Sequence, residues 1–400
     1  MRPKQWYLEK WKVDEAWRIS QGEGVTVAVI DTGVDASHPD VSGQIASEPF
    51  GRGDTDKSGS HGTGIASLIA GTGRGLSGQG VFGVAPKAKI DSYNVADPPD
   101  GRLFAYDTAI RQAADSPAKI INVSSVAPWN PASDEAFAYA LSRGKLIVGG
   151  SGNLNVEPRP SVPYPAAYPG VVGVGGYTNG GTRWANSVTG AWVSLAAPAE
   201  DVPVACTGPT RYCLADGTSA SAALTSGVAA LLWAQHPDYT ANQIIKVLID
   251  SANKPLEGAV PNDSLGYGNV SPRNALNWTG DPGPRDVNPL VGKRGVLPST
   301  SPTPAPSAAP GQSGGTAPAA QPAPAVSTPA AADSAAKSDG DGGSDSLVPV
   351  VGALVGGVVV LSVIVWAFMR SRGNRRGPPP GGPAPPVPTY GPPPPSGLYG

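Results

Sequence analysis

Imidazole acid–base chemistry has few candidates in this chain, because only three histidines occur among 400 residues. His61 lies in "SGSHGTGIASLIAG", at the head of an apolar helical pattern and among glycines that leave the ring room to meet a substrate. His38 lies in the turn-forming stretch "DASHPD". His236 precedes Pro237 at the expected end of a helix, where it would act as a C-terminal cap. His61 is therefore the best candidate for a catalytic base.

A carboxylate that could orient this base follows the most apolar strand pattern, "VAVIDTGVD". Asp31 stands directly at the carboxyl end of that run, where a charge is unfavourable unless it is paired or hydrogen-bonded. The alternative, an aspartate that only begins a turn, fits Asp35 and Asp40 better. Asp31 is the predicted partner of the base.

Two serines, Ser219 and Ser221, lie two residues apart in "GTSASAALTSG", which opens a long apolar helical run. A serine at a helix start is usually only a cap. Ser219, however, follows Gly217 and Thr218, which permit a close approach of the backbone to a substrate, and the helix supplies oriented N–H groups. Together with Asp31 and a histidine it completes a nucleophile–base–acid set. We therefore predict that Ser219 is the nucleophile and that Ser221 packs at the start of the helix.

An oxyanion-stabilising donor is predicted in "VGGSGNLN". Asn153 follows an apolar strand pattern, and its amide could donate to a developing oxyanion beside the backbone N–H of Ser219. An asparagine in a glycine-rich loop is otherwise most simply a turn residue.

The elements that must position these groups alternate between short apolar runs and longer helical patterns. Continuous apolar runs are typical of strands buried on both faces, and their alternation with helices predicts a parallel sheet covered on both sides. The predicted strands are Val25–Ile30, Lys119–Ser124, Lys145–Gly150 and Val171–Gly176, and the clearest helices are Leu103–Asp115 and Ser133–Gly144. In such α/β sheets, active sites gather at the carboxyl ends of the strands.

Composition limits the partners and the compartment. The 29 basic and 31 acidic residues nearly cancel, so no basic excess indicates nucleic-acid binding. The two cysteines, Cys206 and Cys213, flank a turn in "CTGPTRYC". A disulfide between them would imply an oxidising compartment, and the alternative is two reduced thiols close together by chance.

The chain divides into four predicted parts. Residues 1–280 have the composition of a folded domain, whereas 281–346 are rich in Pro, Ala, Ser and Gly and read as a disordered linker. Leu347–Met369 carries no charge and would span roughly 35 Å as a helix, enough to cross a bilayer. Residues 370–400 begin with four closely spaced arginines. The positive-inside rule then places this tail in the cytosol and the large domain outside the cell membrane.

The N-terminal stretch does not fit that topology by itself. "MRPKQWYLEKWKVDEAW" has no apolar h-region and is not a secretory signal. Since export of a large domain ahead of a membrane helix normally needs one, we expect the chain to be a mature or mis-started form.

Six blocks of the sequence resemble the ordered blocks of the subtilisin-like serine proteases over about residues 20 to 275. They are "VAVIDTGVDASHPD", "HGTGIASLIAG", "GVFGVAPKAKI", "INVSS", "SGN" and "GTSASAALTSG". The resemblance implies a three-layer fold with a doubly wound, mostly parallel sheet, and peptide-bond hydrolysis through an acyl-enzyme. Ser219 would attack, His61 would move the proton, Asp31 would hold the tautomer and Asn153 would help to form the oxyanion hole. Ser124, in "INVSS", falls where the family binds the substrate backbone.

The order of protease domain, proline-rich linker, membrane helix and short cytosolic tail resembles the mycosins, the membrane-anchored subtilases of type VII secretion systems. This resemblance implies association with a secretion complex in the membrane, besides cleavage of protein or peptide substrates. A mainly structural component with dispensable proteolysis is the alternative; a non-enzymatic adhesion module would have no reason to carry these blocks. No cofactor is implied. Some subtilases bind structural Ca²⁺, but no set of carboxylate ligands stands out here.

The chain departs from the family pattern at three places. After the nucleophile the family usually has Met and Ala, with a Pro soon afterwards, where this chain has Ala220, Ser221 and Ala223. Gly64 stands where many members have a second histidine, and Ser125–Pro128 reads "SVAP" in place of "SLGG". None of these changes removes a catalytic group, so we expect them to act on substrate preference.

Overall fold

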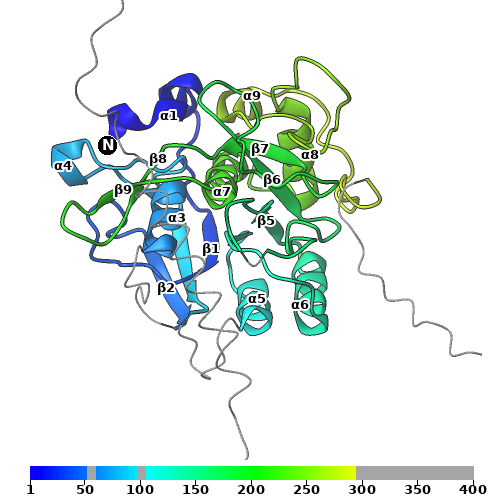
Figure 1. Cartoon of the computed structure of the whole chain (residues 1–400), viewed down its shortest axis with the longest axis horizontal. Coiled ribbons are helices and arrows are strands. Elements are labelled where there is room, and N and C mark those ends of the chain that lie inside the picture. Colours follow the sequence, from blue (N-terminus) through cyan, green and yellow to red (C-terminus); the bar gives the residue numbers. More distant parts are fainter. Residues whose placement is uncertain (52–59, 97–104, 158, 294–400) are drawn as a thin grey trace, which may run out of the picture.

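A single parallel sheet organises the computed structural model, which describes residues 1–51, 60–96, 105–157 and 159–293. The order of its seven strands is β2-β3-β1-β4-β5-β6-β7, and each neighbouring pair is parallel (Figure 1). The strands are β1 (Thr26–Asp31), β2 (Ile45–Phe50), β3 (Lys89–Asn94), β4 (Ile120–Val123), β5 (Leu146–Gly150), β6 (Val172–Tyr177) and β7 (Leu195–Pro198). A separate antiparallel hairpin joins β8 (Val202–Ala205) to β9 (Tyr212–Ala215).

The sheet is apolar on both faces because its central strands alternate their side chains between two cores. In β1, Val27 and Val29 face one core while Ala28 and Ile30 face the other, and all four are buried. This double burial explains why the strands read as continuous apolar runs. The four predicted strands lie within one or two residues of β1, β4, β5 and β6.

Helices cover both faces of the sheet, which gives the predicted three-layer α/β fold. On one face α3 and α7 pack centrally, with α1, α2, α8 and α9 around them, and on the other face lie α5 and α6. The helix bounds are α1 (Trp6–Lys10), α2 (Val13–Ala16), α3 (His61–Ala70), α4 (Gly75–Gly78), α5 (Tyr106–Asp115), α6 (Pro131–Ser142), α7 (Thr218–Gln235), α8 (Ala241–Ser251) and α9 (Pro272–Leu276), with a 3-10 turn at Arg2–Lys4.

The strand order reverses between β1 and β4, and this reversal creates the place for a site. On one side of β1 lie β3 and then the edge strand β2, whereas on the other side β4 to β7 follow one another in chain order. Ligands of open α/β sheets bind at such a switch point, outside the carboxyl ends of the strands. Asp31 is the last residue of β1, and Ser124 directly follows β4.

The folded domain continues past the predicted boundary at residue 280. Leu290 is fully buried in the larger core, and the carbonyl of Arg285 accepts hydrogen bonds from Thr240 Oγ1 and Asn242 Nδ2 at the start of α8. Composition placed these residues in the linker because prolines are frequent there, but one apolar side chain and a few carbonyls are enough to dock the segment.

The remaining linker, the predicted membrane span and the tail lie outside the described residues. Within the part of the chain that is described, no helix has both the length and the apolar character to cross a bilayer.

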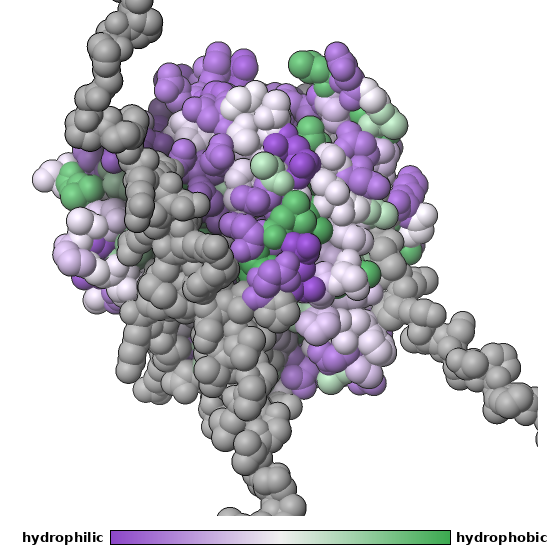
Figure 2. Space-filling view, in the orientation of Figure 1, coloured by the Kyte–Doolittle hydropathy of each residue, from purple (hydrophilic) through white to green (hydrophobic). Residues whose placement is uncertain are grey.

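The described surface is largely polar on the face seen in Figure 2. Hydrophobic side chains gather there only in small patches, one of them over α4, where about half of Leu76 is exposed. Isolated apolar side chains of this kind are normal on the surface of a folded domain.

Replacing Leu290 with alanine tests the docking of this C-terminal segment. Because Leu290 is fully buried, we expect Leu290→Ala to lower the free energy of unfolding by about 2–5 kcal/mol in chemical denaturation. The neighbouring Val291 is 57% exposed, so Val291→Ala serves as the matched control and should change it by less than about 0.5 kcal/mol. Equal stability of the two variants would show that the segment is not part of the fold.

Candidate active site

Asp31 and His61 are in direct contact at the carboxyl edge of the sheet. The distance from His61 Nδ1 to Asp31 Oδ1 is 2.7 Å, and the side chains are 15% and 2% exposed, respectively. The same carboxylate oxygen accepts the backbone N–H of Thr32 at 2.8 Å. Since an ionised carboxylate can only accept, Nδ1 must carry the proton, and the neutral ring then has its lone pair on Nε2. The contact therefore selects the tautomer that a general base needs.

The start of α3 is held against the end of β1. The backbone N–H of Gly62 donates to Thr32 Oγ1 at 3.0 Å, one residue beyond the contact between Asp31 and His61. A Cβ at position 62 would lie only 2.1 Å from the carbonyl oxygen of Gly33, so only glycine allows this approach. The glycine that follows the histidine in the sequence is thus required for packing, and it fixes where the imidazole stands.

The start of α7 is held against the end of β4 by a chain of side-chain hydrogen bonds. Ser124 Oγ donates to the carbonyl of Ser219 at 3.1 Å and accepts from Asn122 Nδ2 at 2.8 Å. Asn122 is fully buried on β4, and its Oδ1 accepts from Ser226 Oγ of α7 at 3.0 Å. The hydroxyl of Ser124 therefore positions the residue predicted to be the nucleophile, while its predicted role toward the substrate backbone stays a prediction.

Asn153 ties the same helix start to the end of β5. Its Oδ1 accepts both the backbone N–H and the hydroxyl of Thr218, each at 3.0 Å. Thr218 Oγ1 in turn accepts the N–H of Gly152 at 3.1 Å. Because Oδ1 of the Asn153 amide bonds to Thr218, Nδ2 of the same amide points the other way. It donates to no atom of the described residues.

The contacts of Ser219 and Asn153 leave an open space beside Gly217. A Cβ built on Gly217 would lie 3.1 Å from Ser219 Oγ, 3.2 Å from Asn153 Nδ2 and 3.8 Å from the backbone nitrogen of Ser219. A reacting carbonyl needs such a position, about 3 Å from both a nucleophile and oxyanion donors. The absence of a side chain at Gly217 keeps this space open.

The other serine of the motif has a different role. Ser221 is fully buried, and its Oγ reaches the carbonyls of Ala197 and Pro198 at 3.1 and 3.0 Å. It therefore packs in the first turn of α7 against β7, as predicted, with its hydroxyl bonded to the strand.

The remaining two histidines stand apart from this site. His38 is fully buried; its Nδ1 accepts the N–H of Asp40, so its Nε2 donates to the carbonyl of Arg211 at 2.8 Å. Burial lowers the pKa of His38. His236 ends α7, as predicted, and stacks on Tyr239 with 4.5 Å between ring centroids; burial lowers the pKa of this ring as well.

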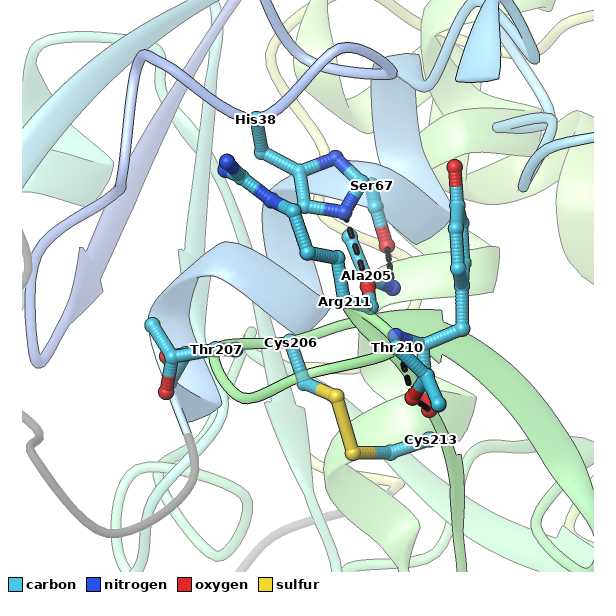
Figure 3. Close-up of a disulfide and its surroundings, with 10 residues drawn as sticks. His38, Ser67, Ala205, Cys206, Thr207, Thr210, Arg211 and Cys213 are labelled. Carbon is cyan, nitrogen blue, oxygen red and sulfur yellow. Dashed lines mark hydrogen bonds between the residues drawn. A yellow bond between two sulfur atoms is a disulfide. The ribbon is translucent and has the colours of Figure 1, made fainter. Parts of the chain in front are cut away.

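The predicted disulfide is present and closes the tip of the hairpin formed by β8 and β9. Figure 3 shows the bond between Cys206 and Cys213 with the groups around it. The hairpin lies on α3: the N–H of Thr207 donates to Ser60 Oγ at 3.0 Å, directly before His61. It therefore supports the helix start that carries the imidazole.

Two further contacts dock the hairpin. The N–H of Ala205 donates to Ser67 Oγ at 3.1 Å (Figure 3), and Arg211 forms an ion pair with Asp35 at 2.8 Å. A Cβ on Gly64 would lie 3.3 Å from Val204 Cβ. Even an alanine at position 64 would therefore make a tight contact with the hairpin.

Three positioning residues were not predicted: Thr32, Asn122 and Thr218. Asn122 had a readable signal, because a buried polar residue inside an apolar strand must be hydrogen-bonded. Thr32 and Thr218 each adjoin a predicted site residue, but their partners lie far away in the sequence and are known only from the fold. Among the described residues, no cluster of three or more His, Cys, Asp or Glu side chains could hold a metal ion.

Comparison with known proteins agrees with this geometry. The model of the subtilase family matches residues 22–268. Mycosin-1 of Mycobacterium tuberculosis is 33% identical over 349 residues, covering 73% of this chain and 77% of that protein. Thermitase of Thermoactinomyces vulgaris is 32% identical, covering 58% of this chain and 83% of that protein. The crystal structure of MycP1 from the ESX-1 type VII secretion system superposes with a TM-score of 0.59 at 29% identity, covering 71% of this chain and 88% of that one.

The chain belongs to the subtilase family, and it is a serine endopeptidase. Within that family it is of the mycosin type, by its similarity to mycosin-1 and to the MycP1 structures.

Removal of the disulfide tests its contribution to stability. Because Cys206 and Cys213 close a short loop, the double variant Cys206→Ser/Cys213→Ser should lose roughly 2–3 kcal/mol of unfolding free energy by the chain-entropy estimate. Denaturation with and without reductant measures this: the wild type should become less stable in reductant, and the double variant should not respond. A wild type that is indifferent to reductant would contradict the expectation.

Proposed function

We propose that Ser219, His61 and Asp31 form the catalytic triad of this endopeptidase, with Asn153 Nδ2 and the backbone N–H of Ser219 as the oxyanion hole. The contact of 2.7 Å between the imidazole and the buried carboxylate is the observation that carries the proposal. The open position beside Gly217, within about 3 Å of both Ser219 Oγ and Asn153 Nδ2, supports it further.

The proposed reaction follows from these positions. Ser219 Oγ attacks the carbonyl carbon of the scissile peptide while His61 Nε2 takes the hydroxyl proton, and Asp31 stabilises the imidazolium that results. The negative charge that develops on the carbonyl oxygen is met by the two oxyanion donors. The C–N bond then breaks as the imidazolium gives its proton to the leaving amine, and an acyl-enzyme remains. Water, deprotonated by the same ring, releases the acid and restores the serine.

Active-site labelling tests the nucleophile. We expect Ser219→Ala to lose all labelling by a fluorophosphonate probe while it retains the thermal unfolding midpoint of the wild type, because only the reacting oxygen is removed. Ser221→Ala is the matched control: its hydroxyl bonds to β7 carbonyls, so labelling should persist. Labelling that survives in Ser219→Ala, or that is lost only in Ser221→Ala, would refute the assignment.

We further propose that this protease is anchored in the cell membrane by Leu347–Met369, with the protease domain outside and the tail from 370 to 400 in the cytosol. The 23 uncharged residues of that segment and the arginines that follow it support this topology. We also propose that it acts with a type VII secretion system. The support is its similarity to MycP1 of the ESX-1 system.

A truncated chain tests the anchor. A variant that ends at residue 346 keeps every described residue but lacks the apolar segment, so it should leave the membrane fraction and appear in the soluble fraction with its fluorophosphonate labelling intact. A reporter fused after Gly400 should be active only on the cytosolic side. Membrane association that survives the truncation, or an external reporter, would overturn the proposed topology.

A further inference from the structure

An open cavity lies between the segment after β4 and the helix α6. Its walls include several aromatic side chains, among them Trp129, Phe137, Tyr164 and Tyr168. Its largely apolar wall suits the stem of a long side chain.

One carboxylate enters this aromatic surface. Asp134, in the first turn of α6, lines the cavity, and its Oδ1 is buried without a hydrogen-bond partner among the described residues. Burial, and next the charge of Asp134, raise the pKa of both Tyr164 and Tyr168, so the carboxylate is close enough to act on both phenols. A buried carboxylate oxygen without a donor is unfavourable, and a ligand that supplies an N–H group would relieve this.

Two polar residues of the cavity wall, Asn130 and Ser133, already pair with each other. Asn130 Oδ1 accepts the N–H of Ser133 at 2.9 Å and caps α6, while Asn130 Nδ2 donates to Ser133 Oγ at 2.9 Å. The next residue, Glu135, points away and pairs with Arg111 at 3.2 Å on the exposed surface. Asp134 is thus the charged group left for a ligand, and the helix N-terminus favours its negative charge.

The cavity is connected to the nucleophile by a short stretch of chain. Ser124 contacts the carbonyl of Ser219, Ser125 Oγ bonds to Tyr106 OH at 2.8 Å in the cavity wall, and Ala127 exchanges two backbone hydrogen bonds with Tyr164. Three residues of extended chain cover roughly 10 Å. A peptide that lies along this stretch would therefore present to the cavity the side chain about three residues away from the one at the scissile bond.

We propose that this cavity is a specificity subsite for a cationic side chain of the substrate, arginine or lysine, whose apolar stem lies between the aromatic rings and whose head group binds Asp134. The inference rests on the proposed function of Ser219. Long cationic side chains suit the site because their methylene stems pack on apolar surface while the charge reaches a polar end. Arginine fits the carboxylate best, since its fork donates two parallel hydrogen bonds.

Internally quenched peptides provide the test on the full-length chain. Each peptide carries one arginine, norleucine or phenylalanine at a different position of an otherwise constant alanine-rich sequence, and mass spectrometry identifies the bond that is cleaved. We expect kcat/KM for arginine to exceed that for norleucine by about tenfold or more at one offset, about three residues from the cleaved residue, and nowhere else.

Substitutions of Asp134 and Glu135 identify the group that binds the cationic side chain of the substrate. Asp134→Asn should bring the ratio of arginine to norleucine close to one, and Asp134→Lys should bring it below one. Glu135→Gln removes the same charge from the adjacent, exposed position and should leave the ratio unchanged. An equal preference in the wild type, a preference for phenylalanine over arginine, or a ratio that Asp134→Asn does not change would overturn the proposal.

A binding measurement separates this proposal from the assignment of the nucleophile. In Ser219→Ala the same peptide sequences, each carrying one fluorophore and no quencher, can be followed by fluorescence polarisation without turnover. Arginine peptides should bind more tightly than norleucine peptides, and the difference should vanish in Ser219→Ala/Asp134→Asn. If the wild type cleaves nothing but this difference is found, the nucleophile is wrong and the subsite stands; if no difference is found, the subsite is wrong.

Discussion

The hydrogen bond between Asp31 and His61 is the interaction on which the rest of the site depends. A nearly buried carboxylate at the end of an apolar strand is unfavourable by itself, and the imidazole and the N–H of Thr32 compensate for it. In return, the carboxylate fixes which ring nitrogen carries the proton. The other contacts described around the site hold the starts of α3 and α7 against the ends of β1, β4 and β5.

Three strand ends of one sheet provide that support. β1 ends in the carboxylate, and the close approach of Gly62 to Gly33 sets the imidazole above it. β4 and β5 hold the start of α7 through Ser124 and Asn153. Because these strands are neighbours at the point where the sheet reverses its order, residues distant in the sequence meet without any distortion of the strands. The disulfide-closed hairpin then covers α3 from outside.

Four of the strands could be predicted because each carries a local signal. Apolar runs marked β1, β4, β5 and β6. In contrast, β3 reads "KIDSYN", and because polar residues are mixed into this buried strand the sequence pattern did not predict it. Thr218 could not be found, because its partners at Gly152 and Asn153 are known only once the fold is. The cavity at Asp134 was equally hidden, since it needs α6, the segment after β4 and the tyrosines near residue 165 together.

Steady-state kinetics of Asp31→Asn test the central claim most directly. An asparagine is nearly the same size but can donate to Nδ1, which would move the ring proton to Nε2 and leave no lone pair to accept the proton of Ser219. The account predicts that kcat falls by about four orders of magnitude with little change in KM, while the variant stays folded. A kcat within tenfold of the wild type would contradict the proposed role of the pair.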